Sequence, residues 1–424
     1  MKKIYLTALA GLLSAVSYGQ CAGGRYSTDV FTNVSVSSGI NYGSNTSFTG
    51  ATTQLDLDVY EPTGDTETAR PLIIWAHGGS FITGSKTDGD VVTLANAFAR
   101  KGYVFVSINY RLGMWPINQP SATQAVVRAV QDMKASIRFF YQDRATTNTY
   151  KIDTTKIFVG GTSAGAITAI HLAYLDKQCE LLEFLSASEI TALGGIDGTS
   201  GNPGYSQDIV GTIGLAGALA SYGWMEAGDV PICMTHGTSD GTVNYSRGMV
   251  NVSGINIMEL DGSRMIDEQA NALGVQSNFY THLGAGHVPH ASSAQYMDTT
   301  VNFIRDFLID VMGCTDAALQ PENAPFGTAT LYALNYCGLS VNENGQKVID
   351  AIYPNPSETE LTVTFSETDS EKEVVLLDLS GRIIEKYSVS GASLIIKRRQ
   401  LNSGTYILKT TVNGIMNTSK IVFK

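Results

Sequence analysis

The sequence has 424 residues, of which 43% are hydrophobic and 16% are charged. This apolar content can fill a sizeable core, so an intrinsically disordered chain is excluded, and the length predicts two or three domains. The formal net charge is −11, and the longest basic run is only Lys397-Arg398-Arg399. Nucleic acid is therefore excluded as a predicted partner.

The chain begins with the layout of a secretory signal peptide, which we predict over residues 1–19. Lys2 and Lys3 precede the apolar stretch 4–16, which is too short to span a bilayer comfortably. Cys21 leaves lipidation open as an alternative, although the residues before it lack the features of a lipobox. We expect the mature chain to be exported.

Export permits disulfides, and the chain has five cysteines. Cys233 lies in an apolar run and is predicted to be a buried strand residue. Cys21, Cys314 and Cys337 lie at the edges of the central region and are the better candidates for a bridge, but the sequence does not fix the pairing. No spacing of Cys and His residues indicates a zinc site.

The central region alternates two kinds of segment. Continuous apolar runs and one alternating run predict strands, and apolar residues at a spacing of three and four predict helices. The predicted strands are 55–62, 71–76, 103–108, 156–159, one from 213 onwards, 231–234 and 275–280; the predicted helices are 123–141, 164–175 and 292–312. This alternation predicts an α/β fold around a mostly parallel sheet.

A G-x-S-x-G sequence stands at 161–165, between a predicted strand and a predicted helix. That context is the one in which such a sequence forms a sharp turn that exposes its serine at the positive end of a helix. Ser163 is therefore the predicted nucleophile. The alternative is a glycine turn with a structural serine.

His77-Gly78-Gly79-Ser80-Phe81 follows another strand. Acyl transfer needs backbone N–H groups directed at the developing oxyanion, and small residues let the carbonyl approach. We predict that the N–H groups of Gly79, Ser80 and Ala164 form this oxyanion hole. His77 is predicted to order the loop.

A hydroxyl nucleophile needs a base, and the base needs an orienting carboxylate. His287 lies in a Gly-rich loop between a strand and the last helix and is the predicted base, with His290 as the alternative. His282 is placed in the preceding strand. Asp240 follows the strand at 231–234 and is the predicted acid; the alternative is an Asx turn before Gly241.

Residues 191–229 are rich in glycine and carry Tyr205, Tyr222 and Trp224. They lie between the helix that follows the nucleophile and the strand that carries the acid. These aromatic side chains are predicted either to line a substrate pocket or to belong to the ordinary core.

Residues from about 50 to 312 resemble the α/β-hydrolase superfamily, and within it the carboxylesterase branch with an H-G-G oxyanion motif. The matching segments are 75–81, 102–112, 161–165, 236–240 and 284–287. The resemblance implies a Ser163, Asp240, His287 triad that needs no cofactor. Arg111 has no catalytic role in it and is predicted to form a structural ion pair. Ser80 and Thr162 depart from the commonest motif residues and leave the subfamily open.

The pattern of apolar and polar residues changes after the last predicted helix. We predict a catalytic domain over 20–318, a linker over 319–347 and a small all-β sandwich over 348–424, with short β-type runs separated by turn signals. Tyr353-Pro-Asn-Pro356, Leu376-Leu-Asp-Leu-Ser-Gly-Arg382 and Leu401-Asn-Ser-Gly-Thr-Tyr406 resemble the C-terminal sorting domain (type A) of type IX secretion in Bacteroidetes. This resemblance implies the outer-membrane secretion machinery as a partner and removal of the tail. The alternative is an unrelated β-sandwich, such as a carbohydrate-binding module.

Together these features predict a secreted serine hydrolase that cleaves a small-molecule or polymeric carboxylic ester through an acyl-enzyme. A serine peptidase or amidase of the same fold, and a hydrolase of polyesters or of plant-wall acetyl or feruloyl esters, stay open as alternatives. A binding protein on an inactive esterase scaffold is disfavoured because all three triad members are present. An adhesin is disfavoured because the sequence has no long repeats.

Overall fold

The computed structural model describes residues 21–252, 254–314, 323, 325–332, 349–366, 370–378, 382–399, 401–412 and 415–424. The chain divides into two compact units, Met1–Leu334 and Asn335–Lys424, which are described separately below. The predicted signal peptide lies outside the described residues. The predicted domain boundaries stay predictions.

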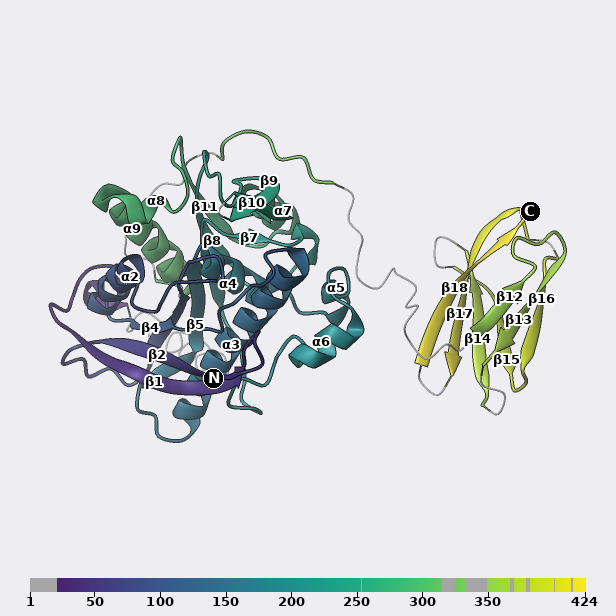
Figure 1. Ribbon diagram of the computed structural model, residues 1–424, viewed down its shortest axis with the longest axis horizontal. Helices are drawn as coiled ribbons and strands as arrows, with labels where there is room; N and C mark the ends of the chain where they lie inside the picture. The colour runs from purple at the N-terminus through teal and green to yellow at the C-terminus, as the bar shows by residue number, and fades with distance from the viewer. Residues whose placement is uncertain are drawn as a thin grey trace, which may run out of the picture. The chain divides into compact units, whose positions relative to one another are not determined.

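The first unit is built on an eight-stranded sheet (Figure 1). Its strand order is β1-β2-β4-β3-β5-β6-β8-β11; the six strands from β4 to β11 run parallel, and β1 and β2 are antiparallel additions. The strands are β1 (Val34–Thr46), β2 (Thr52–Pro62), β3 (Arg70–Ala76), β4 (Val104–Ile108), β5 (Ile152–Thr162), β6 (Gly211–Leu215), β8 (Ile232–Gly237) and β11 (Ser277–His282). The mostly parallel sheet predicted from the sequence is confirmed.

Helices cover both faces of this sheet, which is why its central strands are apolar along their whole length. On one face, α2 (Gly89–Arg100) and α9 (Ala294–Val311) pack Phe98 and Ile304 into one core cluster with Phe105 of β4 (Figure 1). On the other face lie α3 (Gln119–Ala145), α4 (Ala164–Tyr174) and α7 (Ser263–Leu273), in two further clusters. The sequence did not predict α2 or α7.

Smaller elements lie between the main ones. They are η1 (Ala22–Gly24), α5 (Gln178–Leu181), α6 (Ala187–Leu193), β7 (Ala218–Leu219), η2 (Tyr222–Trp224), β9 (Arg247–Val252), β10 (Ile255–Gly262) and α8 (Pro289–Ser292). Strands β9 and β10 form an antiparallel hairpin, and β10 also pairs with β7. The sequence did not predict this β9–β10 hairpin, which forms one wall of the cavity beside Ser163.

Arg111 forms the structural ion pair predicted for it. Its guanidinium lies 2.8 Å from the carboxylate of Asp132 on α3, and both side chains are buried. Asp132 also accepts a hydrogen bond from the backbone N–H of Arg111 and one from the hydroxyl of Ser200. Because a buried ion pair needs its remaining hydrogen bonds satisfied, this network fixes the loop after β4 against α3.

A disulfide joins Cys21 to Cys314. This bridge links the start of the described chain to the end of α9 and uses the cysteine for which lipidation was an alternative. Cys179 also takes part in a disulfide, which the sequence did not predict, whereas Cys337 lies outside the described residues. Cys233 is buried in β8, as predicted.

Replacing both Cys21 and Cys314 with serine is expected to lower the free energy of unfolding of the first unit by about 2–5 kcal/mol, because the bridge closes a very long loop in the unfolded chain. Substitution avoids reducing the disulfide of Cys179. All three tryptophans lie in the first unit, so their fluorescence during guanidinium unfolding reports on that unit alone. An unchanged midpoint would show that the bridge adds no constraint.

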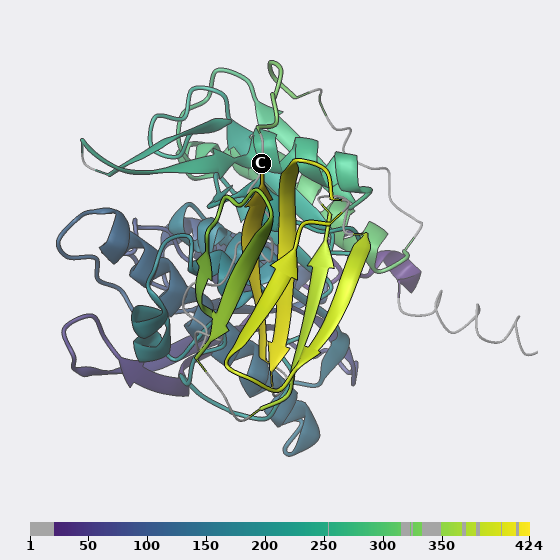
Figure 2. The same cartoon turned by 90° about the vertical axis from the view of Figure 1, so that its right-hand side faces the viewer.

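The second unit consists of two antiparallel sheets (Figure 2). One has the order β12-β13-β16 and the other β15-β14-β17-β18, and one apolar cluster includes side chains from both. The strands are β12 (Ile349–Tyr353), β13 (Glu360–Phe365), β14 (Lys372–Leu377), β15 (Ile383–Val389), β16 (Ser393–Lys397), β17 (Gly404–Val412) and β18 (Ile415–Phe423). An all-β tail is confirmed. No helix within the described part of the chain is long and apolar enough to cross a membrane.

Residues 323 and 325–332, which we call the strap, belong to the first unit and contact the rest of it. The side-chain amide of Asn323 donates to the carbonyl of Thr281 at 2.6 Å and accepts from its N–H at 2.7 Å. The N–H of Phe326 donates to the hydroxyl of Tyr245. This paired contact with β11 attaches the start of the strap to the edge of the central sheet.

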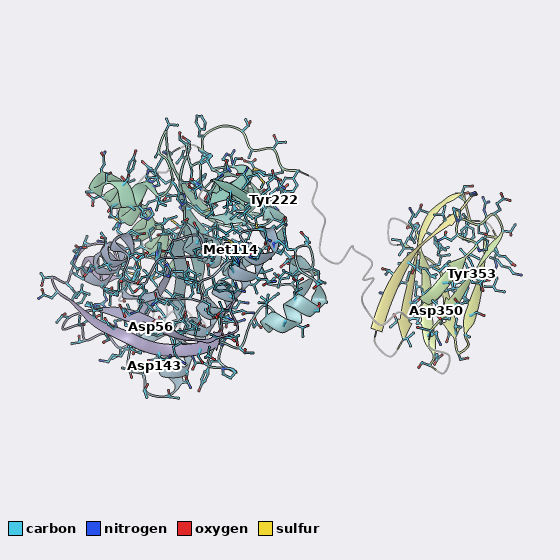
Figure 3. The ribbon with its side chains drawn as sticks, viewed as in Figure 1. Asp56, Met114, Asp143, Tyr222, Asp350 and Tyr353 are labelled. Atoms are coloured by element: carbon cyan, nitrogen blue, oxygen red, sulfur yellow. A yellow bond between two sulfur atoms is a disulfide. The ribbon has the colours of Figure 1, made fainter. Side chains whose placement is uncertain are left out.

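The strap ends on the β9–β10 hairpin. The Tyr332 hydroxyl donates to Asp261 of β10 at 2.6 Å, and the Arg247 guanidinium of β9 lies 4.1 Å above the Tyr332 ring. Tyr222, labelled in Figure 3, donates its hydroxyl to the carbonyl of Tyr332. Because Arg247 also pairs with Asp261, the strap and both hairpin strands share one network.

Candidate active site

Ser163 lies in a strained turn between β5 and α4. Its φ of 55° and ψ of −115° are unusual for a residue with a side chain, and α4 begins at the next residue. A Cβ atom on Gly165 would lie 2.0 Å from the carbonyl oxygen of Ala76, so only glycine allows α4 to approach β3 this closely. The turn thus places Ser163 at the carboxyl end of the parallel strands.

The structure brings the three predicted triad side chains together. Ser163 Oγ lies 2.8 Å from His287 Nε2, and His287 Nδ1 lies 2.7 Å from Asp240 Oδ2. An ionised carboxylate only accepts hydrogen bonds, so Nδ1 carries a proton and Nε2 is left to accept from the serine hydroxyl. The alternative base, His290, instead lies 3.4 Å from Asp90 and from the Thr162 hydroxyl.

Asp240 is held by four donors. Its Oδ1 accepts from the backbone N–H groups of Thr242 and Val243, which is the Asx-turn geometry considered from the sequence. Its Oδ2 accepts from His287 and lies 3.2 Å from Nε2 of His236. Burial alone would raise the pKa of Asp240, but the hydrogen bonds from His236 and His287 outweigh it and hold that pKa well below its usual value. Asp240 can therefore form the Asx turn and orient His287 at the same time.

Sequence reasoning missed His236 as a partner of the acid. The side chain is fully buried at the end of β8, four residues before Asp240. Its Nε2 also lies 3.0 Å from the carbonyl of Val243, and its Nδ1 lies 2.8 Å from the hydroxyl of Ser263. With a carbonyl and a carboxylate around it, Nε2 carries the proton, and Nδ1 accepts from Ser263. The only signal in the sequence was its four-residue spacing from Asp240.

The predicted oxyanion loop folds back on itself beside Ser163. Gly79, Ser80 and Phe81 all have positive φ angles, and the N–H groups of Ile82 and Thr83 donate to the carbonyl of Gly79. A Cβ atom on Gly79 would lie 2.1 Å from the Thr83 carbonyl oxygen, so the turn requires glycine there. The roles of the Gly79, Ser80 and Ala164 N–H groups stay predictions.

His77 is buried at the base of this loop, as predicted for a residue that orders it. Its Nδ1 lies 2.6 Å from the carbonyl of Gly78, its ring stacks on Tyr110, and the Tyr110 hydroxyl donates to the His77 carbonyl. Burial lowers the pKa of His77. The neutral ring is thus a fixed part of the loop.

Two hollows meet at Ser163. One is a mostly apolar cavity, and the other is more open and has a mixed polar and apolar lining; Ser80 and Ser163 are among the residues that line both. Of the three aromatic residues considered from the sequence, Trp224 lines the apolar cavity. Tyr222 is buried against the strap instead, and Tyr205 lines a separate surface hollow.

No group of three or more His, Cys, Asp or Glu residues in the described part of the chain could hold a metal ion.

Two family models match the chain, BD-FAE over residues 57–192 and the secretion system C-terminal sorting domain over residues 351–424. Carboxylesterase 3B of Mus musculus is 42% identical over 62 residues, which are 14% of this chain and 10% of that protein. Neuroligin-like protein glit-1 of Caenorhabditis elegans is 29% identical over 114 residues, 26% of this chain and 15% of that protein. The matches thus span only a small part of these curated relatives.

The apo form of Thermogutta terrifontis esterase 2 is a similar solved structure, with 19% identity and a TM-score of 0.47, covering 68% of this chain and 98% of that one. The BD-FAE match includes Ser163 and the whole oxyanion loop, and the sorting-domain match includes nearly all of the second unit. Residues 57–192 are therefore similar to the BD-FAE domain, an α/β-hydrolase esterase domain, and residues 351–424 are similar to the secretion system C-terminal sorting domain.

Proposed function

We propose that the protein is a secreted serine hydrolase that cleaves carboxylic esters. The observation that carries the proposal is the hydrogen-bonded series Ser163, His287, Asp240, with the serine in a strained turn at the positive end of α4. The BD-FAE match and the carboxylesterase relatives support an ester as the substrate.

In the proposed mechanism, His287 takes the proton of Ser163 as its Oγ attacks the ester carbonyl. Asp240 holds the imidazole in the required tautomer and stabilises the imidazolium that forms. The N–H groups of Gly79, Ser80 and Ala164 bind the negative oxygen of the tetrahedral intermediate. His287 then protonates the leaving alcohol, and water cleaves the acyl-enzyme by the same steps in reverse roles.

The proposed route to the outside begins with the signal peptide, residues 1–19. The sorting domain then directs the chain through the outer-membrane secretion machinery to the cell surface or the medium. The match of residues 351–424 to the secretion system sorting domain supports this route.

Covalent labelling tests the proposal directly. One equivalent of diisopropyl fluorophosphate is expected to abolish hydrolysis of p-nitrophenyl acetate and to add its mass to the peptide that contains Ser163. A His287→Gln variant leaves the serine without its base, so labelling should slow at least about 100-fold.

Comparison of the ester with p-nitroacetanilide separates the alternatives. Hydrolysis of the anilide at a rate similar to that of the ester would favour the peptidase or amidase alternative. A folded protein that is neither labelled nor active on any ester would overturn the proposal.

A further inference from the structure

The two hollows beside Ser163 differ in volume, in openness and in the share of polar groups in their linings. The apolar cavity has a volume of about 60 Å³ and is enclosed by α3, α4, the end of α5 and the β9–β10 hairpin. Its hairpin wall consists of Val250, Val252, Ile257, Met258 and Leu260. Such a surface binds aliphatic groups through burial alone.

The cavity runs along α4 and away from Ser163. The lining on this side begins at Ala164 of α4 and ends at Leu175, the residue that follows α4, a span of about 16 Å at the usual helical rise. Leu181 of α5 and Phe184 line the part that follows the end of α4. The cavity is therefore deeper than an acetyl group requires.

Two polar side chains of the lining already have hydrogen-bond partners. His171 Nδ1 lies 2.8 Å from the carbonyl of Ile167, and its Nε2 accepts from the N–H of Ala220. The Thr123 hydroxyl donates to the carbonyl of Gln119. The indole nitrogen of Trp224 has no partner but is covered by neighbouring atoms. A hydroxyl group on a buried acyl chain would thus lose its hydrogen bonds to water in a lining that offers few partners.

The second hollow, of about 520 Å³, has a mixed lining with many more polar groups. Asp88, Asp90 and Asn251 line it, and so does His287, which does not line the apolar cavity. Because His287 must protonate the leaving alcohol, the alcohol lies on this polar side. The acyl chain would then occupy the apolar cavity.

We infer that the substrates are esters of unbranched aliphatic acids of medium chain length, of the octanoate class, with hydrophilic alcohols. This inference rests on the proposed function and specifies its substrate. It places acetyl and feruloyl esters among the poorer substrates, because an acetyl group buries little apolar surface and a phenolic hydroxyl loses its hydrogen bonds to water in a mostly apolar lining.

The test measures kcat/KM of the full chain on p-nitrophenyl esters from acetate to laurate and on a p-nitrophenyl ferulate. Each methylene buried up to octanoate is expected to raise kcat/KM about fourfold. Ferulate is expected to fall at least tenfold below octanoate. With the acyl group held as octanoate, a glycerol ester is expected to be hydrolysed faster than an ester of an anionic hydroxy acid, which Asp88 and Asp90 would repel.

Substitutions at adjacent residues provide a matched comparison. Leu181 lines the far part of the cavity, whereas Leu182 is 38% exposed and lies outside it. Leu181→Trp is expected to lower the octanoate-to-butyrate ratio of kcat/KM about tenfold, and Leu182→Trp is expected to leave that ratio unchanged. Val126→Phe on α3 tests the same wall if Leu181→Trp does not fold.

The possible failures are distinguishable. A flat dependence on chain length, an equal effect of both tryptophan variants, or ferulate as the best substrate would overturn the inference while leaving the esterase intact. Absence of all ester hydrolysis and of serine labelling would instead overturn the proposed function.

Discussion

Replacing Ser163 with alanine is expected to lower kcat for p-nitrophenyl esters by about 10⁶-fold. In the proposed mechanism the Ser163 hydroxyl accepts the acyl group, and His287, 2.8 Å away, activates it as the base. The change removes a single oxygen atom and should leave the thermal unfolding temperature nearly unchanged. Steady-state kinetics with a sensitive fluorogenic ester would measure the residual rate.

Ser239→Ala is the matched control. Ser239 is exposed, precedes Asp240 and undergoes the same chemical change, so its kcat is expected to stay within about twofold of the wild type. If the Ser163→Ala variant kept more than a tenth of the wild-type rate, the nucleophile would have to be another residue.

Asp240→Asn is expected to cost about 10⁴-fold in kcat, with a smaller effect on KM. The carboxylate accepts from His287 Nδ1, whereas an amide can donate there and so favour the tautomer that cannot take the serine proton. His236 would lose its charged partner in the same change. Asp267→Asn removes another buried carboxylate, on α7 away from the site, and should leave kcat within a few-fold.

The same variant has an expected effect on stability at acid pH. The pKa of Asp240 is lower in the folded protein than in the unfolded chain, so its carboxylate stabilises the fold above about pH 4, and this contribution is lost as the pH falls through the folded-state pKa. Unfolding free energies measured between pH 6 and pH 2 should therefore fall less steeply for Asp240→Asn than for the wild type. Parallel curves would contradict the role of the two histidines.

The sequence predicted the parallel strands because strands buried on both faces, such as β3, β4 and β5, are apolar along their whole length. It also predicted which histidine lies beside Ser163, since His287 follows β11 and the carboxyl ends of parallel strands meet at one edge. The apolar runs and the position of His287 after a strand can both be read from short segments of the sequence, and each indicates a single structure.

The cavity wall gave no such signal. Strand β9 carries Arg247, Asn251 and a glycine among its apolar residues, and its burial depends on α3 and α4, which are far away in the sequence. The same holds for Cys179, whose disulfide needs two segments to meet in space. These features depend on long-range packing, which a single sequence does not display.

The strap has a consequence for maturation. If the sorting domain is cleaved off after export, a cut before Asn323 would also remove Tyr332, its hydrogen bond to Asp261 and its contact with Arg247. Strand β10, which carries Asp261, lines the acyl side of the site through Ile257, so the position of the cut decides whether a peptidase leaves a complete enzyme or one with a loosened wall. A protease that cuts C-terminal to Tyr332 would keep these contacts with the hairpin, and one that cuts before Asn323 would remove them.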